Sequence, residues 1–364
     1  MPDTVSVPQA AAGTAFRLFP TCKFVRGGAY SAVYDLERRR LYRFESGFAG
    51  LFELAASRGG IPLAELEELS PPARRKALEA IDYMRENEIG HEVDAFSLRH
   101  VAELPEGWAI PQPIANAIVD VDDRVHDWPA LIAALGALQC DSLQIRSFST
   151  LLDLAALDEI VAATARSSIA HVEAIMIWTE ALESTDWRAL FERHRNLVTI
   201  QLHGAPEDKE INAGSSEAMT VRFVRWSKAP IRGAGACGNI VHGSLQAPSV
   251  ALYSELRSFN GCLNRKVSIR ADGEICNCPS MRSGFGKDVS RLSEIVASPV
   301  FQRPWRLRKD DIEGCKGCEF RYVCTDCRAY LESDVSLAKP ARCRYDPATG
   351  TWASARRPVE EGLG

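Results

Sequence analysis

The chain has 364 residues, of which 46% are hydrophobic and 25% are charged, values that are typical of globular proteins and exclude fibrous and disordered classes. Its 43 Lys and Arg residues and 48 Asp and Glu residues give a net charge of −5, which excludes a general attraction to nucleic acid or anionic membranes. No run approaches the roughly 20 apolar residues that a membrane helix needs. We therefore expect a cytoplasmic protein of two or three domains with no nucleic-acid or membrane partner.

Residues 15–95 are expected to form a small winged-helix-like module. On either side of Gly27 and Gly28, β-branched and aromatic residues recur near every second position, which predicts a β-hairpin. Three helical segments follow, and the last begins at Ser70 as an N-cap and ends at Gly90.

Such a module could bind DNA, bind a peptide or serve only for packing. Residues 15–93 carry 12 basic and 12 acidic side chains, so the basic surface of a DNA-binding domain is missing. We therefore expect peptide binding, at the strand edge within Phe24–Phe44 and the adjacent helix Ser70–Ile89.

Residues 108–260 alternate between strand and helix patterns, which predicts an α/β fold with a parallel sheet or an incomplete barrel. The expected strands cover residues 114–122, 142–148, 171–178, 197–204 and 220–226.

Active sites in such folds lie at the carboxyl ends of the strands. The polar and aromatic residues there form no known catalytic set; they are Asp120, Asp122, Asp123, His126, Arg146, Ser147, Trp178, Glu180 and His203. We interpret residues 120–127 as an acidic loop that caps the next helix rather than as a loop that binds a divalent cation. His203 is expected to be a hydrogen-bonded structural residue. The glycine-rich segment 233–240 lacks the spacing of a nucleotide-binding loop, so we expect a turn at which backbones approach closely.

Cysteine is the unusual feature of the composition. Eight of the eleven cysteines lie between residues 262 and 343, namely Cys262, Cys276, Cys278, Cys315, Cys318, Cys324, Cys327 and Cys343. In a reducing compartment this crowding favours metal or cluster binding over disulfides. Two Cys-x2-Cys pairs, at 315–318 and 324–327, are typical of a tight turn that holds one metal with two thiolates. Zinc and iron–sulfur clusters both accept four thiolates, so the spacing leaves the choice open.

The cysteine spacing resembles the seven-cysteine pattern of SPASM domains, the auxiliary-cluster domains of radical SAM peptide maturases. Two features depart from it: the pair Cys324–Cys327 is separated by two residues where the usual pattern has three, and Cys276 is extra. The segments CLNRKVSI, DGEICNCPSM, CKGCEFRYVCTDCRAY and KPARCRYDPATGTW further resemble the grasp-with-SPASM peptide maturase family.

This resemblance implies three units: a leader-peptide recognition domain at 15–95, a degenerate radical SAM-type partial β/α barrel at 108–260 and a SPASM-like metal or cluster domain at 261–352. It also implies a precursor peptide and an ATP-grasp ligase as partners, with the leader added as a strand to a sheet edge. A working radical SAM enzyme needs a Cys-x3-Cys-x2-Cys triad after its first barrel strand, and the chain contains none. We therefore expect no S-adenosylmethionine cluster.

By analogy with SPASM domains, one site would use Cys315, Cys318, Cys324 and Cys343. The other would use Cys262, Cys278 and Cys327, with its fourth position left for Cys276, a substrate group or solvent. The resemblance implies iron–sulfur clusters of the [4Fe-4S] type, with zinc as the alternative. A single site that uses both Cys324 and Cys327 also stays open.

Seven basic residues surround the Cys-x2-Cys pairs: Arg303, Arg306, Arg308, Lys309, Lys316, Arg321 and Arg328. They either offset thiolate charge and support the fold or bind an acidic precursor core.

Two functions remain open, and no catalytic residue is assigned. The first is an accessory maturation protein that binds the precursor leader while an ATP-grasp ligase forms side-chain ester or amide crosslinks. The second is a peptide-modifying metalloenzyme that uses an open iron–sulfur or zinc site. A winged-helix regulator with a metal-sensing domain is disfavoured by the balanced charge of residues 15–93.

Overall fold

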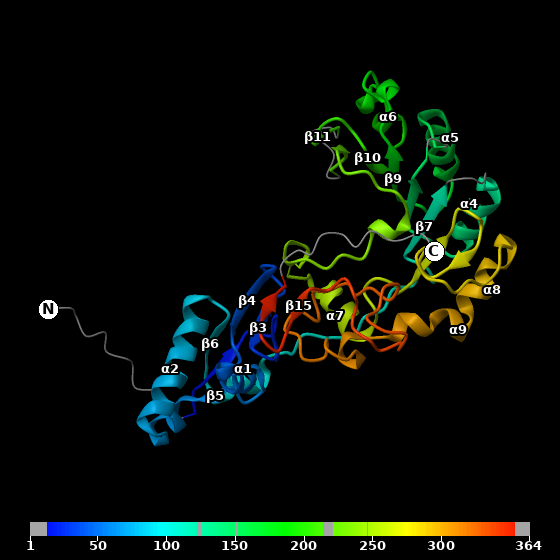
Figure 1. Ribbon diagram of the computed structural model, residues 1–364. Helices are drawn as coiled ribbons and strands as arrows, with labels where there is room; N and C mark the ends of the chain where they lie inside the picture. Colours follow the sequence, from blue (N-terminus) through cyan, green and yellow to red (C-terminus); the bar gives the residue numbers. More distant parts are fainter. Residues whose placement is uncertain (1–12, 122–125, 150–151, 214–220, 246, 354–364) are drawn as a thin grey trace.

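The computed structural model describes residues 13–121, 126–149, 152–213, 221–245 and 247–353. The expected α/β class is confirmed, since a large mixed sheet with flanking helices dominates one end of the molecule and two small sheets lie at the other (Figure 1). No helix in the described ranges is long and apolar enough to cross a membrane.

The amino-terminal part contains two three-stranded antiparallel sheets and two α-helices. One sheet has the order β2-β3-β4 and the other has the order β5-β1-β6. Phe16, Phe52, Ile81 and Met84 belong to the core between the sheets and the helices. The elements are β1 (Ala15–Leu18), β2 (Cys22–Val25), β3 (Tyr30–Asp35), β4 (Arg40–Glu45), α1 (Ala49–Ala56), β5 (Ile61–Pro62), a 3₁₀ turn (Leu63–Glu68), α2 (Pro71–Glu86) and β6 (Gly90–Val93).

Helix α2 differs from its expected boundaries. Ser70 occupies the N-cap position, but its side chain makes no capping hydrogen bond. The helix ends at Glu86 rather than at Gly90, because Glu88 has a φ of 53° that the helix cannot continue through. Gly90 begins β6 instead, and a Cβ there would lie 2.7 Å from the carbonyl oxygen of Arg17, so the pairing of β6 with β1 requires glycine.

The large sheet has the strand order β11-β12-β10-β9-β8-β7-β13-β14. Strands β13, β7, β8, β9, β10 and β12 pair in parallel, and the edge strands β11 and β14 are antiparallel. The bounds are β7 (Asn116–Val121), α4 (Trp128–Ala137), β8 (Ser142–Ser147), α5 (Leu154–Thr164), β9 (His171–Ile177), α6 (Trp187–Arg193), β10 (Leu197–His203), β11 (Lys209–Asn212), β12 (Phe223–Ser227), β13 (Lys266–Ile269) and β14 (Ile275–Cys276).

The expected strand and helix alternation is confirmed over this region. Each crossover helix begins at an aspartate, and the side chains of Asp127, Asp153 and Asp186 accept hydrogen bonds from backbone N–H groups three residues further on. These caps satisfy amides that have no partner within the helix and so fix where each helix starts.

Strands β13 and β14 extend this sheet beyond the expected boundary between residues 260 and 261. Lys266–Ile269 pairs with Asn116–Val119 of β7, and Leu263, Val267 and Ile275 share one core with the β/α strands. The beginning of the cysteine-rich segment is therefore built into the sheet.

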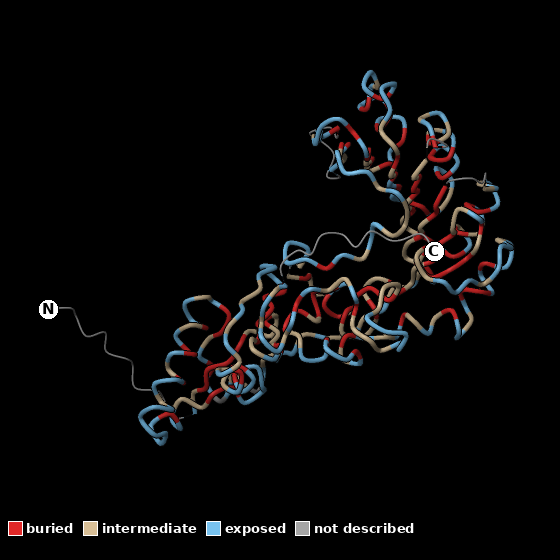
Figure 2. The backbone as a smooth tube through the Cα atoms, viewed as in Figure 1, coloured by how far each residue is buried: buried red, intermediate tan, exposed pale blue. Residues whose placement is uncertain are grey.

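The rest of the cysteine-rich segment has little regular structure and packs on the amino-terminal part. Figure 2 shows buried backbone continuing between the two ends of the molecule. A third core joins Val25 and Tyr34 of the β2-β3-β4 sheet to Tyr253, Phe320 and Tyr345. The remaining elements are α3 (Ala95–His100), α7 (Val250–Ser258), α8 (Leu292–Ala297), α9 (Pro299–Gln302), β15 (Tyr345–Asp346) and β16 (Thr351–Trp352).

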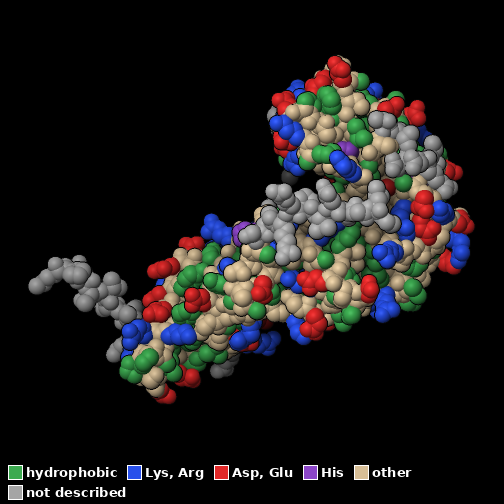
Figure 3. Space-filling model, viewed as in Figure 1, with side chains coloured by type: hydrophobic (Ala, Val, Ile, Leu, Met, Phe, Trp, Pro, Cys, Tyr) green, Lys and Arg blue, Asp and Glu red, His purple; other side chains and the backbone are tan. Residues whose placement is uncertain are grey.

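Charged side chains of both signs are interspersed over the face shown in Figure 3, without a continuous basic surface there.

Candidate metal centre

All eleven cysteines are free thiols, and the eight between residues 262 and 343 fall into separate surroundings. Cys315, Cys318, Cys324 and Cys343 line one cavity, together with aromatic residues that include Phe320 and Trp352. These four are the residues expected to share the first site.

Tight turns place the first set. The amide of Cys315 donates to the carbonyl of Ile312 (3.0 Å), and the amide of Cys318 donates to the carbonyl of Cys315 (2.9 Å). The sulfur of Cys318 accepts a hydrogen bond from the amide of Phe320 (3.4 Å). Backbone N–H groups directed at sulfur are the kind of contact that stabilises thiolate charge in metal and cluster sites.

A buried lysine supplies positive charge to the first set. Lys309 is 5% exposed, and its Nζ lies 3.7 Å from the Cys315 sulfur and 2.9 Å from Oδ1 of Asp326. Asp326 also accepts from Arg328 Nη2 (2.8 Å). Burial opposes the charge on Lys309, but Cys324, Asp326 and Cys315 together raise its pKa well above the ordinary value. The ammonium group therefore stays charged beside the sulfurs.

Burial also determines the pKa values of the thiols in the first set. It raises the pKa of Cys315 to about 11 and raises the pKa of Cys324, while Lys309 lowers both. In the absence of a metal these groups are therefore protonated at neutral pH, and a metal must displace their protons to bind.

The structure also brings Cys262, Cys278 and Cys327 near one another. Burial raises the pKa of Cys262, thiolate charge on Cys278, Cys237 and Cys327 raises it further, and Lys266 lowers it. Lys266 Nζ lies 3.7 Å from the Cys262 sulfur, so this set also has a lysine.

Cys276 has different surroundings from this second set. It lies in β14, is fully buried, and its thiol donates to the carbonyl of Ser268 (3.6 Å). Burial raises its pKa to about 11, and its electrostatic neighbours are Arg270, Cys278 and Asp120.

The sequence analysis does not name Cys237 as a candidate metal ligand, because only the glycine-rich segment around it forms a recognisable pattern. Segment 233–240 contains the expected turn, at Ala234–Ala236, but its close approach is to side chains: Gly238 has a φ of +90°, and a Cβ on it would lie 2.9 Å from the Cys327 sulfur.

The side chains of both cysteine sets are chemically suited to bind a metal ion or an iron–sulfur cluster through thiolates. Four cysteines around one cavity and three more beside a lysine offer soft sulfur ligands, which suit zinc and iron–sulfur clusters. In the described part of the chain, however, no three His, Cys, Asp or Glu side chains form a metal-binding group as they stand.

The basic residues around the Cys-x2-Cys pairs are largely engaged in ion pairs. Arg308 pairs with Asp311, Lys316 with Glu313, and Arg321 with Asp310, in addition to the contacts of Lys309 and Arg328 with Asp326. These contacts favour support of the fold over binding of an acidic peptide.

The carboxyl ends of the parallel strands hold a buried polar network. Arg146 binds Asp120 through two hydrogen bonds, of 2.7 and 3.0 Å. The two ring nitrogens of His203 contact the carbonyl of Ser147 (3.1 Å) and the amide of Ile231 (3.2 Å), which confirms its structural role. Asp122 and Asp123 lie outside the described residues.

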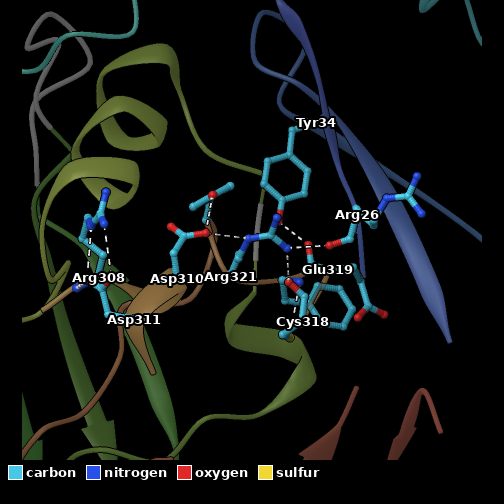
Figure 4. A network of polar contacts seen from close by, with 10 residues as sticks. Arg26, Tyr34, Arg308, Asp310, Asp311, Cys318, Glu319 and Arg321 are labelled. Atoms are coloured by element: carbon cyan, nitrogen blue, oxygen red, sulfur yellow. Dashed lines mark hydrogen bonds and ion pairs between the residues drawn. The ribbon is translucent and has the colours of Figure 1, made fainter. Parts of the chain in front are cut away.

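The segment that holds Cys318 also binds the amino-terminal sheet. Glu319 is fully buried and accepts a hydrogen bond from Arg43 Nε (2.8 Å) and another from the Tyr345 hydroxyl. The Tyr34 hydroxyl donates to the carbonyl of Glu319, and Arg321 Nη1 donates to the carbonyl of Arg26 (2.6 Å) (Figure 4).

No family model matches the chain, and no curated protein matches it. The heterocyclase TruD is a structural match with 12% sequence identity and a TM-score of 0.17, over 41% of this chain and about a quarter (24%) of that structure.

Glu319→Ala should lower the free energy of unfolding by about 3 kcal/mol, because it leaves the guanidinium of Arg43 without its buried partner. Chemical denaturation followed by tryptophan fluorescence measures this change. Glu313→Ala, which removes an exposed partner of Lys316, is the control and should change it by less than about 0.5 kcal/mol. Equal effects of the two variants would contradict the structural role of Glu319.

Zinc affinity of the metal-free chain should rise steeply between pH 6.5 and 8.5. The thiol pKa values are raised, so each thiol that binds must release a proton, and affinity gains up to about tenfold per pH unit for each proton released. Competition with a chromophoric chelator measures the slope. A flat profile would contradict thiolate ligation.

Proposed function

We propose that this chain is a maturation partner of the grasp-with-SPASM type, which presents a ribosomally made precursor peptide to an ATP-grasp ligase. Its amino-terminal winged-helix-like module binds the leader, its SPASM-like segment binds [4Fe-4S] clusters or zinc, and the ligase forms the side-chain ester or amide crosslinks. The observation that carries the proposal is the β2-β3-β4 sheet, which is packed on both faces and in which β4 pairs with a strand on one side only among the described residues.

Both faces of this sheet are covered. On one face, Phe44 stacks on Phe52 with ring centroids 3.8 Å apart. On the other, Arg43 lies 3.6 Å from the ring centroid of Tyr30 and binds Glu319. A sheet fixed in this way is preorganised to accept another strand at small entropic cost.

The edge of β4 that faces away from β3 is the one at which we propose that the leader pairs. Among the described residues, β4 has a strand partner on one side only, which is β3. The amide of Ser46 donates to the carbonyl of Ala29 (3.0 Å), in register with the β3–β4 pairs. Because backbone groups alternate in direction along a strand, Leu41, Arg43 and Glu45 direct theirs outward. An extended leader peptide could pair with these groups.

Helix α2 borders the same strand. The Tyr42 hydroxyl donates to the carbonyl of Asn87 (3.3 Å) just after the helix, and Phe52 links Phe44 to Tyr83 through ring contacts. These contacts place the end of the helix against the face of β4, next to the strand at which we propose pairing.

The β/α part supports an accessory role. The chain has no Cys-x3-Cys-x2-Cys triad, and Arg146 and Asp120 bind each other at the strand ends. A buried bidentate ion pair has few donors or acceptors left for a substrate.

The purified chain should bind the precursor encoded beside such a system without changing its mass, and the ATP-grasp ligase should form crosslinks many-fold faster when the chain is added. Fluorescence anisotropy measures binding, and mass spectrometry counts the water molecules lost from the peptide. A mass change produced by this chain alone would overturn the accessory role and favour the metalloenzyme alternative.

Glu45→Pro should weaken leader binding by about two- to tenfold, the effect of one lost hydrogen bond. Glu45 has a φ of −60°, which proline adopts without strain, and its amide points away from β3. Glu45→Ala removes the same carboxylate but keeps the amide, so it should bind the leader like the wild type. Equal affinities of the proline and alanine variants would contradict pairing at this part of the edge.

A further inference from the structure

The set of Cys262, Cys278 and Cys327 has three thiols, whereas a closed zinc or cluster site needs four ligands from the protein. The identity of the fourth ligand decides whether the site is closed or open to substrate. Segment 233–240, between β12 and α7, passes directly beside this set.

The backbone of the segment lies against Cys327. A Cβ at Gly238 would approach the Cys327 sulfur to 2.9 Å and a side-chain carbon of Tyr330 to 3.3 Å. Gly238 also has a φ of +90°, which a residue with a side chain rarely adopts. Glycine at this position therefore allows the residue before it, Cys237, to come close to Cys327.

Contacts from both sides hold the segment in this place. Ser280 Oγ, two residues after Cys278, donates to the carbonyl of Ala234 (3.1 Å). Arg342 Nη1 donates to the carbonyls of Gly235 and Cys237, and its guanidinium lies 3.6 Å from the ring centroid of Tyr330. Ile240 forms a parallel bridge with Cys343 of the first set.

Cys237 also lies near two members of the set, Cys262 and Cys278, within the range of electrostatic interaction. Cys276, by contrast, is fully buried in β14, where its thiol donates to the carbonyl of Ser268.

We propose that Cys237 supplies the fourth thiolate of the second site, with Cys262, Cys278 and Cys327. This inference rests on the proposed metal-binding role of the cysteine-rich segment and deepens it, because the site is then closed by the protein. The metal would tie the segment that leaves β12 to the cysteine-rich part, and no position would remain for a substrate on it.

The full chain, reconstituted anaerobically with ferrous iron and sulfide or with zinc, tests this ligand. Cys237→Ala should lower bound metal by about one half, as Cys327→Ala should, because each removes one of four ligands from one of two sites. Cys276→Ala is the matched control and should retain the wild-type content. Full metal content in Cys237→Ala, or loss of metal in Cys276→Ala alone, would overturn the assignment.

Alkylation provides a readout that does not depend on metal content. Cys237 is exposed, so iodoacetamide should modify it rapidly in the metal-free chain, and loading with metal should slow this reaction at least tenfold. Equal rates with and without metal would overturn the proposal.

A wild-type chain that binds only enough metal for the first site would overturn the Cys237 site and leave the proposed function standing. Failure to bind any metal would overturn both the site and the metal-binding part of that function. Leader binding, measured on the same preparations, tests peptide recognition separately.

Discussion

The buried carboxylate of Glu319 is the interaction on which the relation between the parts of this molecule depends. It follows directly after Cys318, and it binds Arg43 of β4 and Tyr345 of β15. A carboxylate without solvent is costly unless it is paired, so these partners must be in place whenever the segment is folded. The turn that positions Cys318 is consequently also the turn that orients the β2-β3-β4 sheet.

This arrangement links the β2-β3-β4 sheet to the cysteine-rich part through packing. Tyr34 and Val25 of the sheet share a core with Phe320 and Tyr345, so neither side can bury its apolar residues without the other. The cysteine-rich part has short strands and turns rather than long helices, and segments of this kind gain much of their folding energy from bound metal. Metal at the first set would therefore stabilise the sheet whose edge we propose as the leader site.

The sequence alone predicts the β/α region well because its signals are local. Apolar runs alternate with helices that begin at Asp127, Asp153 and Asp186, and these aspartates cap the helices in the structure. Strands β5 and β6 were not expected, and β1 was not separated from β2 within the expected hairpin, since each of the three has four residues or fewer and is stabilised by pairing with distant segments. The pairing of β13 with β7 is likewise a long-range contact that no local pattern reports.

The assignment of cysteines to sites from the sequence has the same limit, because local patterns do not report long-range contacts. The resemblance to SPASM domains implies the four cysteines that line one cavity, of which Cys315, Cys318 and Cys324 are close in the chain. It gives no sign of Cys237, whose approach to Cys327 depends on Gly238 and on contacts with Ser280 and Arg342. Residues that meet only through tertiary structure can be assigned to a common site from the structure but not from their spacing in the sequence.

The polar groups at the strand ends of the large sheet are engaged with one another and with the backbone. Here Arg146 and Asp120 are both buried and satisfy each other, and His203 contacts backbone groups through both nitrogens. These contacts stabilise the strand ends. The sheet holds the start of the cysteine-rich part through β13, and the strand edge at which we propose leader binding lies at the opposite end of the molecule (Figure 1).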